Sequence, residues 1–124
     1  MNIILQHMDG PLRPLDVASV ANMKRYAEMV GAEYELVQGR PFRQHLTGAC
    51  QKVYMLDEKY DDYDQVLMVD IDMFAPKHMK ENVFDLQGVG LYADTQVMLH
   101  NKIVRHAPMF ASLKHAYWGG AIYK

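Results

Sequence analysis

The stretch from Val66 to Pro76, VLMVDIDMFAP, constrains the fold of this chain more than any other feature. Four apolar residues lead directly to two aspartates, Asp70 and Asp72, which are separated by one residue. A continuous apolar run of this length is typical of a strand that is buried on both faces, as in a parallel sheet covered by helices. An unpaired carboxylate is costly inside such a strand, so the two acids indicate its end.

Strand and helix patterns alternate along the rest of the chain. Residues 2–6 form an apolar run, and apolar residues at three- and four-residue steps from Leu15 predict a helix that ends at Gly31. We expect further strands at residues 32–37, 65–70, 88–93 and 117–123, and helices at residues 49–59, 77–84 and 96–114. This order predicts an α/β fold with a mainly parallel sheet and helices on both faces.

The helical periods also predict which residues face the sheet. For the first helix these are Val17, Val20, Met23, Ala27 and Val30, and for the helix at residues 49–59 they are Ala49, Val53 and Leu56.

Composition limits the classes of partner. The 124 residues are half hydrophobic and 23% charged, which is typical of one globular domain. A formal net charge of −2, without a basic tail, gives no electrostatic basis for binding nucleic acid or an anionic membrane. The apolar runs are too short to span a bilayer. The single cysteine, Cys50, cannot form an internal disulfide, and we see no signal peptide, so we expect a cytoplasmic protein.

The aspartate pair favours a divalent cation. If the backbone stays extended through Ile71, the carboxylates of Asp70 and Asp72 point to the same side, because residues two apart share a face. Two such charges about 4 Å apart repel by roughly 4 kcal/mol at an effective dielectric of about 20. Mg²⁺ or Mn²⁺ converts this repulsion into attraction, and Mg²⁺ usually shares its shell with substrate phosphates. The pair therefore predicts a metal-dependent site for a nucleoside diphosphate; the alternative is an idle, exposed turn before Pro76.

Residues 63–76, YDQVLMVDIDMFAP, resemble the metal-binding segment of nucleotide-sugar-dependent glycosyltransferases of the GT-A fold. Those enzymes typically carry a tyrosine–aspartate pair, a short apolar strand, an acid–x–acid motif and more apolar residues. The matching residues occur here in that order: Tyr63, Asp64, Val66, Leu67, Val69, Asp70, Asp72 and Phe74. The similarity extends more loosely to QKVYMLDEKY upstream, and to GVGLYAD and WGGAIY downstream.

The resemblance implies a Rossmann-like, GT-A-type mixed sheet in one nucleotide-sugar-binding domain, residues 1–124, that lacks much of the acceptor half. Asp72 would ligate Mn²⁺ or Mg²⁺ directly, and Asp70 would reach the metal and the hydroxyls of the donor. Lys52 stands where glycogenin-like members carry a basic residue that contacts a phosphate, and this likeness favours retention of the anomeric configuration. Gly119 and Gly120 would lie against the donor sugar, although both also fit a simple bulge or turn.

The loop after the first strand, HMDGPLRP, lies at the same edge of the sheet as the acids, where ligands of parallel sheets collect. His7, Asp9 or Arg13 could contact a base, ribose or phosphate there; a turn set by glycine and proline, without any contact, is the alternative. The residues predicted to bind the nucleotide sugar are therefore His7, Lys52, Asp70, Ile71, Asp72, Gly119 and Gly120. A third metal ligand could come from His100, His106 or His115, each of which also fits a surface position.

Together these features predict a glycosyltransferase that transfers a sugar from a nucleotide-diphosphate donor to an acceptor that the sequence does not identify. A haloacid-dehalogenase-like phosphohydrolase also ends a strand with two acids, and would use Asp70 as nucleophile and Asp72 as acid and base. That family usually places Thr or Val where Phe74 stands. The third hypothesis is a nucleotide-binding fragment without turnover. An exposed sheet edge on a chain this short would also gain from pairing into a homo-oligomer.

Overall fold

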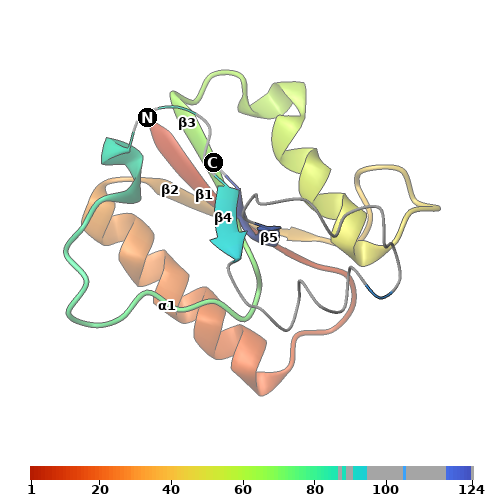
Figure 1. Ribbon diagram of the computed structural model, residues 1–124, viewed down its shortest axis with the longest axis horizontal. Coiled ribbons are helices and arrows are strands. Elements are labelled where there is room, and N and C mark those ends of the chain that lie inside the picture. The colour runs from red at the N-terminus through yellow and green to blue at the C-terminus, as the bar shows by residue number, and fades with distance from the viewer. Residues whose placement is uncertain (87, 89–90, 95–104, 106–116, 124) are drawn as a thin grey trace.

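The computed structural model describes residues 1–86, 88, 91–94, 105 and 117–123 (Figure 1). The elements in chain order are β1 (Asn2–Met8), α1 (Pro14–Val30), β2 (Glu33–Gln38), the 3₁₀ helices η1 (Gly48–Leu56) and η2 (Glu58–Tyr60), β3 (Gln65–Val69), the 3₁₀ helix η3 (Val83–Asp85), β4 (Leu91–Asp94) and β5 (Tyr117–Tyr123). The α/β class expected from the sequence is confirmed.

The described strands form one five-stranded sheet in the order β2-β1-β3-β5-β4. The first strand, β1, pairs in parallel with both β2 and β3, so that Ile4 lies opposite Tyr34 on one side and Leu67 on the other. The last strand, β5, runs antiparallel to β3 and to β4. The sheet is therefore mixed, with a parallel core made of β2, β1 and β3.

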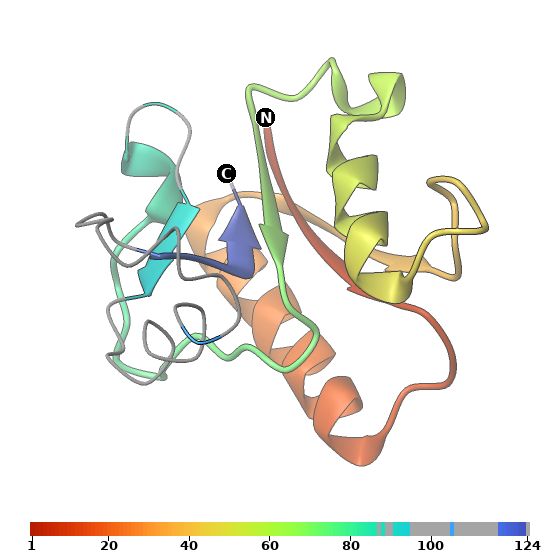
Figure 2. The same cartoon turned by 45° about the vertical axis from the view of Figure 1, so that its right-hand side comes forward.

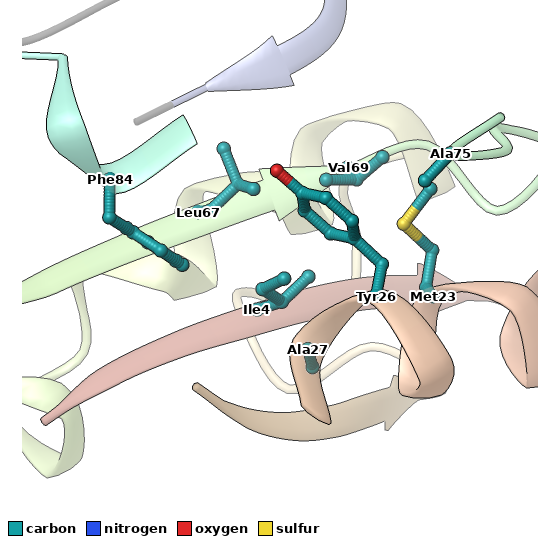
Figure 3. Close-up of a cluster of buried hydrophobic side chains, with 8 residues drawn as sticks. All are labelled: Ile4, Met23, Tyr26, Ala27, Leu67, Val69, Ala75 and Phe84. Atoms are coloured by element: carbon teal, nitrogen blue, oxygen red, sulfur yellow. The ribbon is translucent and has the colours of Figure 1, made fainter. Parts of the chain in front are cut away.

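Helices cover both faces of the parallel core, with α1 on one side and η1 on the other (Figures 1 and 2). Alternate residues of β1 point to opposite faces. Ile4 packs in a cluster with Met23, Tyr26 and Ala27 of α1, Leu67 and Val69 of β3, Ala75 and Phe84 (Figure 3). Its neighbours Ile3 and Leu5 pack on the other face with Met68 and Tyr60, against the partly buried Tyr54 and Met55.

The ends of α1 are fixed by local chemistry. Pro14 occupies the first turn, and the buried Asp16 accepts a hydrogen bond from the backbone N–H of Arg13 at 2.8 Å. At the other end Gly31 adopts a left-handed φ of 69°, which a glycine tolerates without strain. Both ends lie where the sequence predicts them.

The buried face of α1 is rotated from the predicted one. The buried residues are Asp16, Ser19, Met23, Tyr26 and Ala27, whereas Val17 is 53% exposed. Ser19 and the partly buried Asn22 turn inward because they donate hydrogen bonds to backbone carbonyls of Met73 and Ala75. A prediction from apolar spacing alone misses these polar contacts.

The predicted inner face of the helix at residues 49–59 is wrong. In η1, Ala49 is exposed, Val53 is 44% exposed and Leu56 is 77% exposed. The fully buried residue is Gln51, whose side chain accepts from the N–H of Phe42 at 2.9 Å and donates toward carbonyls of the preceding loop. The need to satisfy that loop turns the Gln51 side of η1 inward.

Two further predicted elements differ. The helix expected at residues 77–84 is reduced to η3, and the segment before it has no regular structure. The helix expected at residues 96–114 falls outside the described residues except at Arg105. Within the described part of the chain, no helix has the length and apolar character needed to cross a bilayer.

Candidate functional site

The candidate site lies at the edge of the sheet where the carboxyl ends of β1 and β3 meet the start of η1. An open pocket of about 420 Å³ occupies this position. Its lining residues are His7, Met8, Asp9, Gly48, Ala49, Lys52, Asp70, Ile71 and Asp72. Five of the seven residues predicted to bind the nucleotide sugar are thus brought together in one pocket.

The two aspartates are presented by a turn and not by an extended strand. Strand β3 ends at Val69, and the N–H of Met73 donates to the carbonyl of Asp70 at 3.1 Å, which closes a turn over Ile71 and Asp72. The condition stated for the aspartate pair, an extended backbone through Ile71, is therefore not met. Asp70 and Asp72 still line the same pocket, together with Ile71 between them.

A buried amide fixes this turn. Gln6 is fully buried in β1, and its Nε2 donates to the carbonyl of Asp70 at 2.9 Å and to Oγ of Ser19 at 3.0 Å. The hydroxyl of Tyr34 donates to Oε1 of Gln6 at 2.8 Å, and burial raises the pKa of Tyr34, which keeps that hydroxyl protonated. Ser19 in turn donates to the carbonyl of Met73 at 2.5 Å. These hydrogen bonds hold both ends of the acidic turn against the sheet and α1.

Sequence reasoning did not single out Gln6 or Ser19. The signal was present, because Gln6 is the polar residue that ends the apolar run NIILQ inside a buried strand. A polar side chain in such a position needs buried partners. Finding those partners required the fold.

Each acid has a cation in its neighbourhood. Lys52 of η1 forms an ion pair with Asp70, and the two side chains are 21% and 31% exposed. Asp72 is exposed and lies within electrostatic reach of Arg13. The pKa of Arg13 is raised chiefly by its hydrogen bond to Asp16, with a smaller contribution from the charge of Asp72. Lys52 was predicted to contact a phosphate. In this structure it contacts Asp70, one of the two acids predicted to bind the metal ion.

Two residues of the pocket, His7 and Asp9, contact residues that directly follow β2. His7 is 9% exposed and its Nε2 lies 2.6 Å from the carbonyl oxygen of Gly39. The carboxylate of Asp9 accepts from Nε of Arg40 at 2.8 Å. A side chain at Gly48 would place its Cβ 3.3 Å from Cβ of Asp9, so the glycine permits this close approach. The side of the pocket formed by His7 and Asp9 is therefore polar.

Gly119 and Gly120 belong to β5 and are absent from the pocket lining given by the described residues. Strand β5 runs antiparallel to β3, with Tyr123 opposite Met68 and Ile122 opposite Val69. The residues that precede Ile122 in β5 therefore extend toward the carboxyl end of β3. His100, His106 and His115 fall outside the described residues.

The side chains of this pocket fit a metal ion that is bound jointly by the protein and a ligand better than a metal ion that is bound by protein side chains alone. Among the described residues, no group of three or more His, Cys, Asp or Glu side chains is arranged to hold a metal ion. Mg²⁺, however, is usually bound through one or two carboxylates, with waters and substrate phosphates completing its shell. Asp70 and Asp72 at an open pocket meet that description.

Comparison with known proteins gives no family for this chain. Neither a protein-family model, nor a curated protein, nor a solved structure matches it. The geometry of the site therefore has to carry the functional conclusion.

Proposed function

We propose that this chain binds a nucleotide-diphosphate sugar together with Mn²⁺ or Mg²⁺ and transfers the sugar to an acceptor, as a GT-A-like glycosyltransferase. The observation that carries the proposal is the pocket of about 420 Å³ into which the fold brings Asp70, Asp72, Lys52 and His7. Its volume lies within the range of about 300–1,000 Å³ that is usual for small-molecule sites. The mixed sheet, the helices on both faces and the sequence resemblance at residues 63–76 support a Rossmann-like, GT-A-type architecture.

The residues of the pocket have different roles in this proposal. Asp72, exposed at the mouth, and Asp70, at the end of β3, supply the carboxylate ligands for the cation. Lys52 contributes a positive charge that can form a charge-assisted hydrogen bond with a phosphate oxygen. When bound, the divalent cation would stabilise negative charge on the leaving nucleoside diphosphate as a Lewis acid. Gly119 and Gly120 would lie against the donor sugar, as the sequence resemblance implies, and would leave room for it because they carry no side chain.

The binding experiment is a calorimetric titration with nucleoside diphosphates and nucleotide sugars, with and without Mn²⁺. The proteins are the wild type, Asp72→Ala and, as a matched control, Asp62→Ala, which removes an exposed acid outside the pocket. We expect binding that needs both the cation and Asp72, with a loss of at least about tenfold in Asp72→Ala, equivalent to roughly 1.4 kcal/mol. Asp62→Ala should bind like the wild type. Equal binding without the cation would exclude the proposal.

Product analysis separates the remaining hypotheses. Release of nucleoside diphosphate from a sugar donor supports the transferase. Hydrolysis of a generic phosphate ester that is abolished in Asp70→Asn would instead support a phosphohydrolase, because Asp70 would then be the nucleophile. Cation-dependent binding without donor hydrolysis or transfer would indicate a nucleotide-binding protein without turnover.

A further inference from the structure

The ion pair between Lys52 and Asp70 lies inside the pocket proposed to hold the metal ion. Lys52 comes from η1 and Asp70 from the end of β3, and both line the pocket. Their side chains are 21% and 31% exposed, so salt screens the pair less than it screens fully exposed charges. The lysine therefore stands beside a carboxylate that the proposed function assigns to a divalent cation.

The carboxylate of Asp70 cannot bind the ammonium group of Lys52 and a divalent metal ion equally well at the same time. A divalent ion that approaches Asp70 meets the like charge of Lys52 and must displace it or tolerate the repulsion. The ammonium group of lysine is a compact charge on a flexible stem, so it can exchange one anionic partner for another. A diphosphate that enters the same pocket offers Lys52 such a partner. Moving Nζ to a phosphate oxygen would free Asp70 for the cation.

We propose that Lys52 is an internal counter-ion, which neutralises Asp70 until a diphosphate draws it away and thereby makes metal binding depend on the diphosphate. This inference rests on the proposed function. It requires the free protein to bind Mn²⁺ weakly and the diphosphate to strengthen that binding. By thermodynamic linkage Mn²⁺ then strengthens diphosphate binding by the same factor.

The first test measures Mn²⁺ binding to the free protein, through the loss of the electron paramagnetic resonance signal of the aqueous ion. Lys52→Met removes the charge and keeps an apolar stem. It should bind Mn²⁺ alone more tightly than the wild type, by about 5- to 150-fold if the counter-ion supplies a typical coupling. The matched control is Lys59→Met, which breaks the ion pair between Lys59 and Glu35 outside the pocket. This control should bind Mn²⁺ like the wild type.

The second test asks whether the lysine acts through Asp70 or only through general electrostatics. In the Asp70→Asn background, Lys52→Met should no longer tighten Mn²⁺ binding, because the acid that the lysine neutralises is gone. A gain of the same size in both backgrounds would overturn the inference. Lys52→Gln is the second variant should Lys52→Met fail to fold, as judged by circular dichroism.

The third measurement repeats the Mn²⁺ titration with UDP, GDP or ADP present, with the metal–diphosphate equilibrium taken from protein-free titrations. The wild type should bind Mn²⁺ more tightly with diphosphate, and Lys52→Met should lose at least about fivefold of that coupling. If diphosphate strengthens Mn²⁺ binding equally in both proteins, the inference is wrong and the proposed function stands. If no diphosphate strengthens Mn²⁺ binding to the wild type, the proposed function fails and the inference fails with it.

Discussion

At the scale of single residues, Gln6 shows how one buried amide can position a site that it does not enter. Its donors and acceptor are taken by Asp70, Ser19 and Tyr34, so it joins β1, α1, β2 and the acidic turn. In a medium of low dielectric such hydrogen bonds are strong, and the loss of one partner leaves the others unsatisfied. The position of Asp70 therefore depends on a residue on a different strand.

Replacing Gln6 by leucine should destabilise the protein strongly. Gln6→Leu has a similar volume but leaves the carbonyl of Asp70 and the hydroxyls of Ser19 and Tyr34 without this partner. Because each buried unsatisfied group costs about 1–3 kcal/mol, we expect a loss of at least about 2 kcal/mol in the free energy of unfolding, measured by urea denaturation. Gln38→Leu, at the exposed end of β2, should stay within about 0.5 kcal/mol of the wild type. A loss that small in Gln6→Leu would contradict the role assigned to this amide.

Asp16 makes a second residue-scale prediction, which concerns pH. Its carboxylate accepts hydrogen bonds from the guanidinium and the backbone N–H of Arg13, which hold its pKa below the ordinary value of 3.8. Because the pKa is lower in the folded than in the unfolded state, the stabilisation is complete well above pH 3.8 and is lost as pH falls below it.

The measurement compares the free energy of unfolding of the wild type and Asp16→Asn across pH. The variant should be less stable at neutral pH, and the difference should shrink as the pH falls below about 4, where Asp16 of the unfolded chain becomes protonated. A difference that grows on acidification would contradict this assignment.

At the scale of elements, α1 organises the irregular segment that follows the acidic turn. Asn22 holds Ala75 by two hydrogen bonds, donating to its carbonyl at 3.0 Å and accepting from its N–H at 2.7 Å. The hydroxyl of Tyr26 donates to the carbonyl of Glu81 at 2.9 Å and accepts from the N–H of Val83 at 3.2 Å. The helix therefore supplies the backbone partners that a regular element at residues 77–84 would have supplied itself.

Tyr26→Phe tests this role of α1. The ring stays in the apolar cluster, but the carbonyl of Glu81 and the N–H of Val83 lose a part-buried hydrogen bond each. We expect a loss of about 1–3 kcal/mol in the free energy of unfolding, measured by urea denaturation. Tyr63→Phe, which removes a hydroxyl bonded to the exposed Glu33, is the matched control and should cost less. Equal costs for the two substitutions would show that the backbone contacts of Tyr26 add nothing.

The strands were predictable from sequence, whereas the buried faces of the helices were not. Apolar runs depend on local sequence, and residues 2–6, 65–70 and 117–123 all lie within or overlap observed strands. The inward position of Asn22 depends on backbone groups of Ala75, which is distant in sequence, and that of Gln51 on backbone groups of the loop just before η1. An apolar period reveals neither contact. The pocket followed from strand direction, since parallel strands that end at one edge bring their next residues together. The ion pair of Lys52 with Asp70 depends on how η1 is rotated and was not foreseen.

At the scale of the whole molecule, the core is divided by the sheet into two apolar layers, and the outer face of η1 belongs to neither. Phe84 is 3% exposed in the layer beside α1, whereas Leu56 of η1 is 77% exposed. We expect Phe84→Ala to cost about 3–5 kcal/mol in the free energy of unfolding, because it leaves a cavity. Leu56→Ser should stay within about 0.5 kcal/mol of the wild type. A large loss in the free energy of unfolding of Leu56→Ser would instead support the inward orientation of Leu56 that its spacing predicts.

The central place of β1 has a consequence for synthesis on the ribosome. Strand β1 leaves the exit tunnel before β3, and the two can pair only when Gln65 is available opposite Asn2. Until then one hydrogen-bonding edge of the nascent strand faces solvent or a chaperone. Asp70 and Asp72 follow closely after β3, so the candidate pocket can form only after β3 has paired with β1.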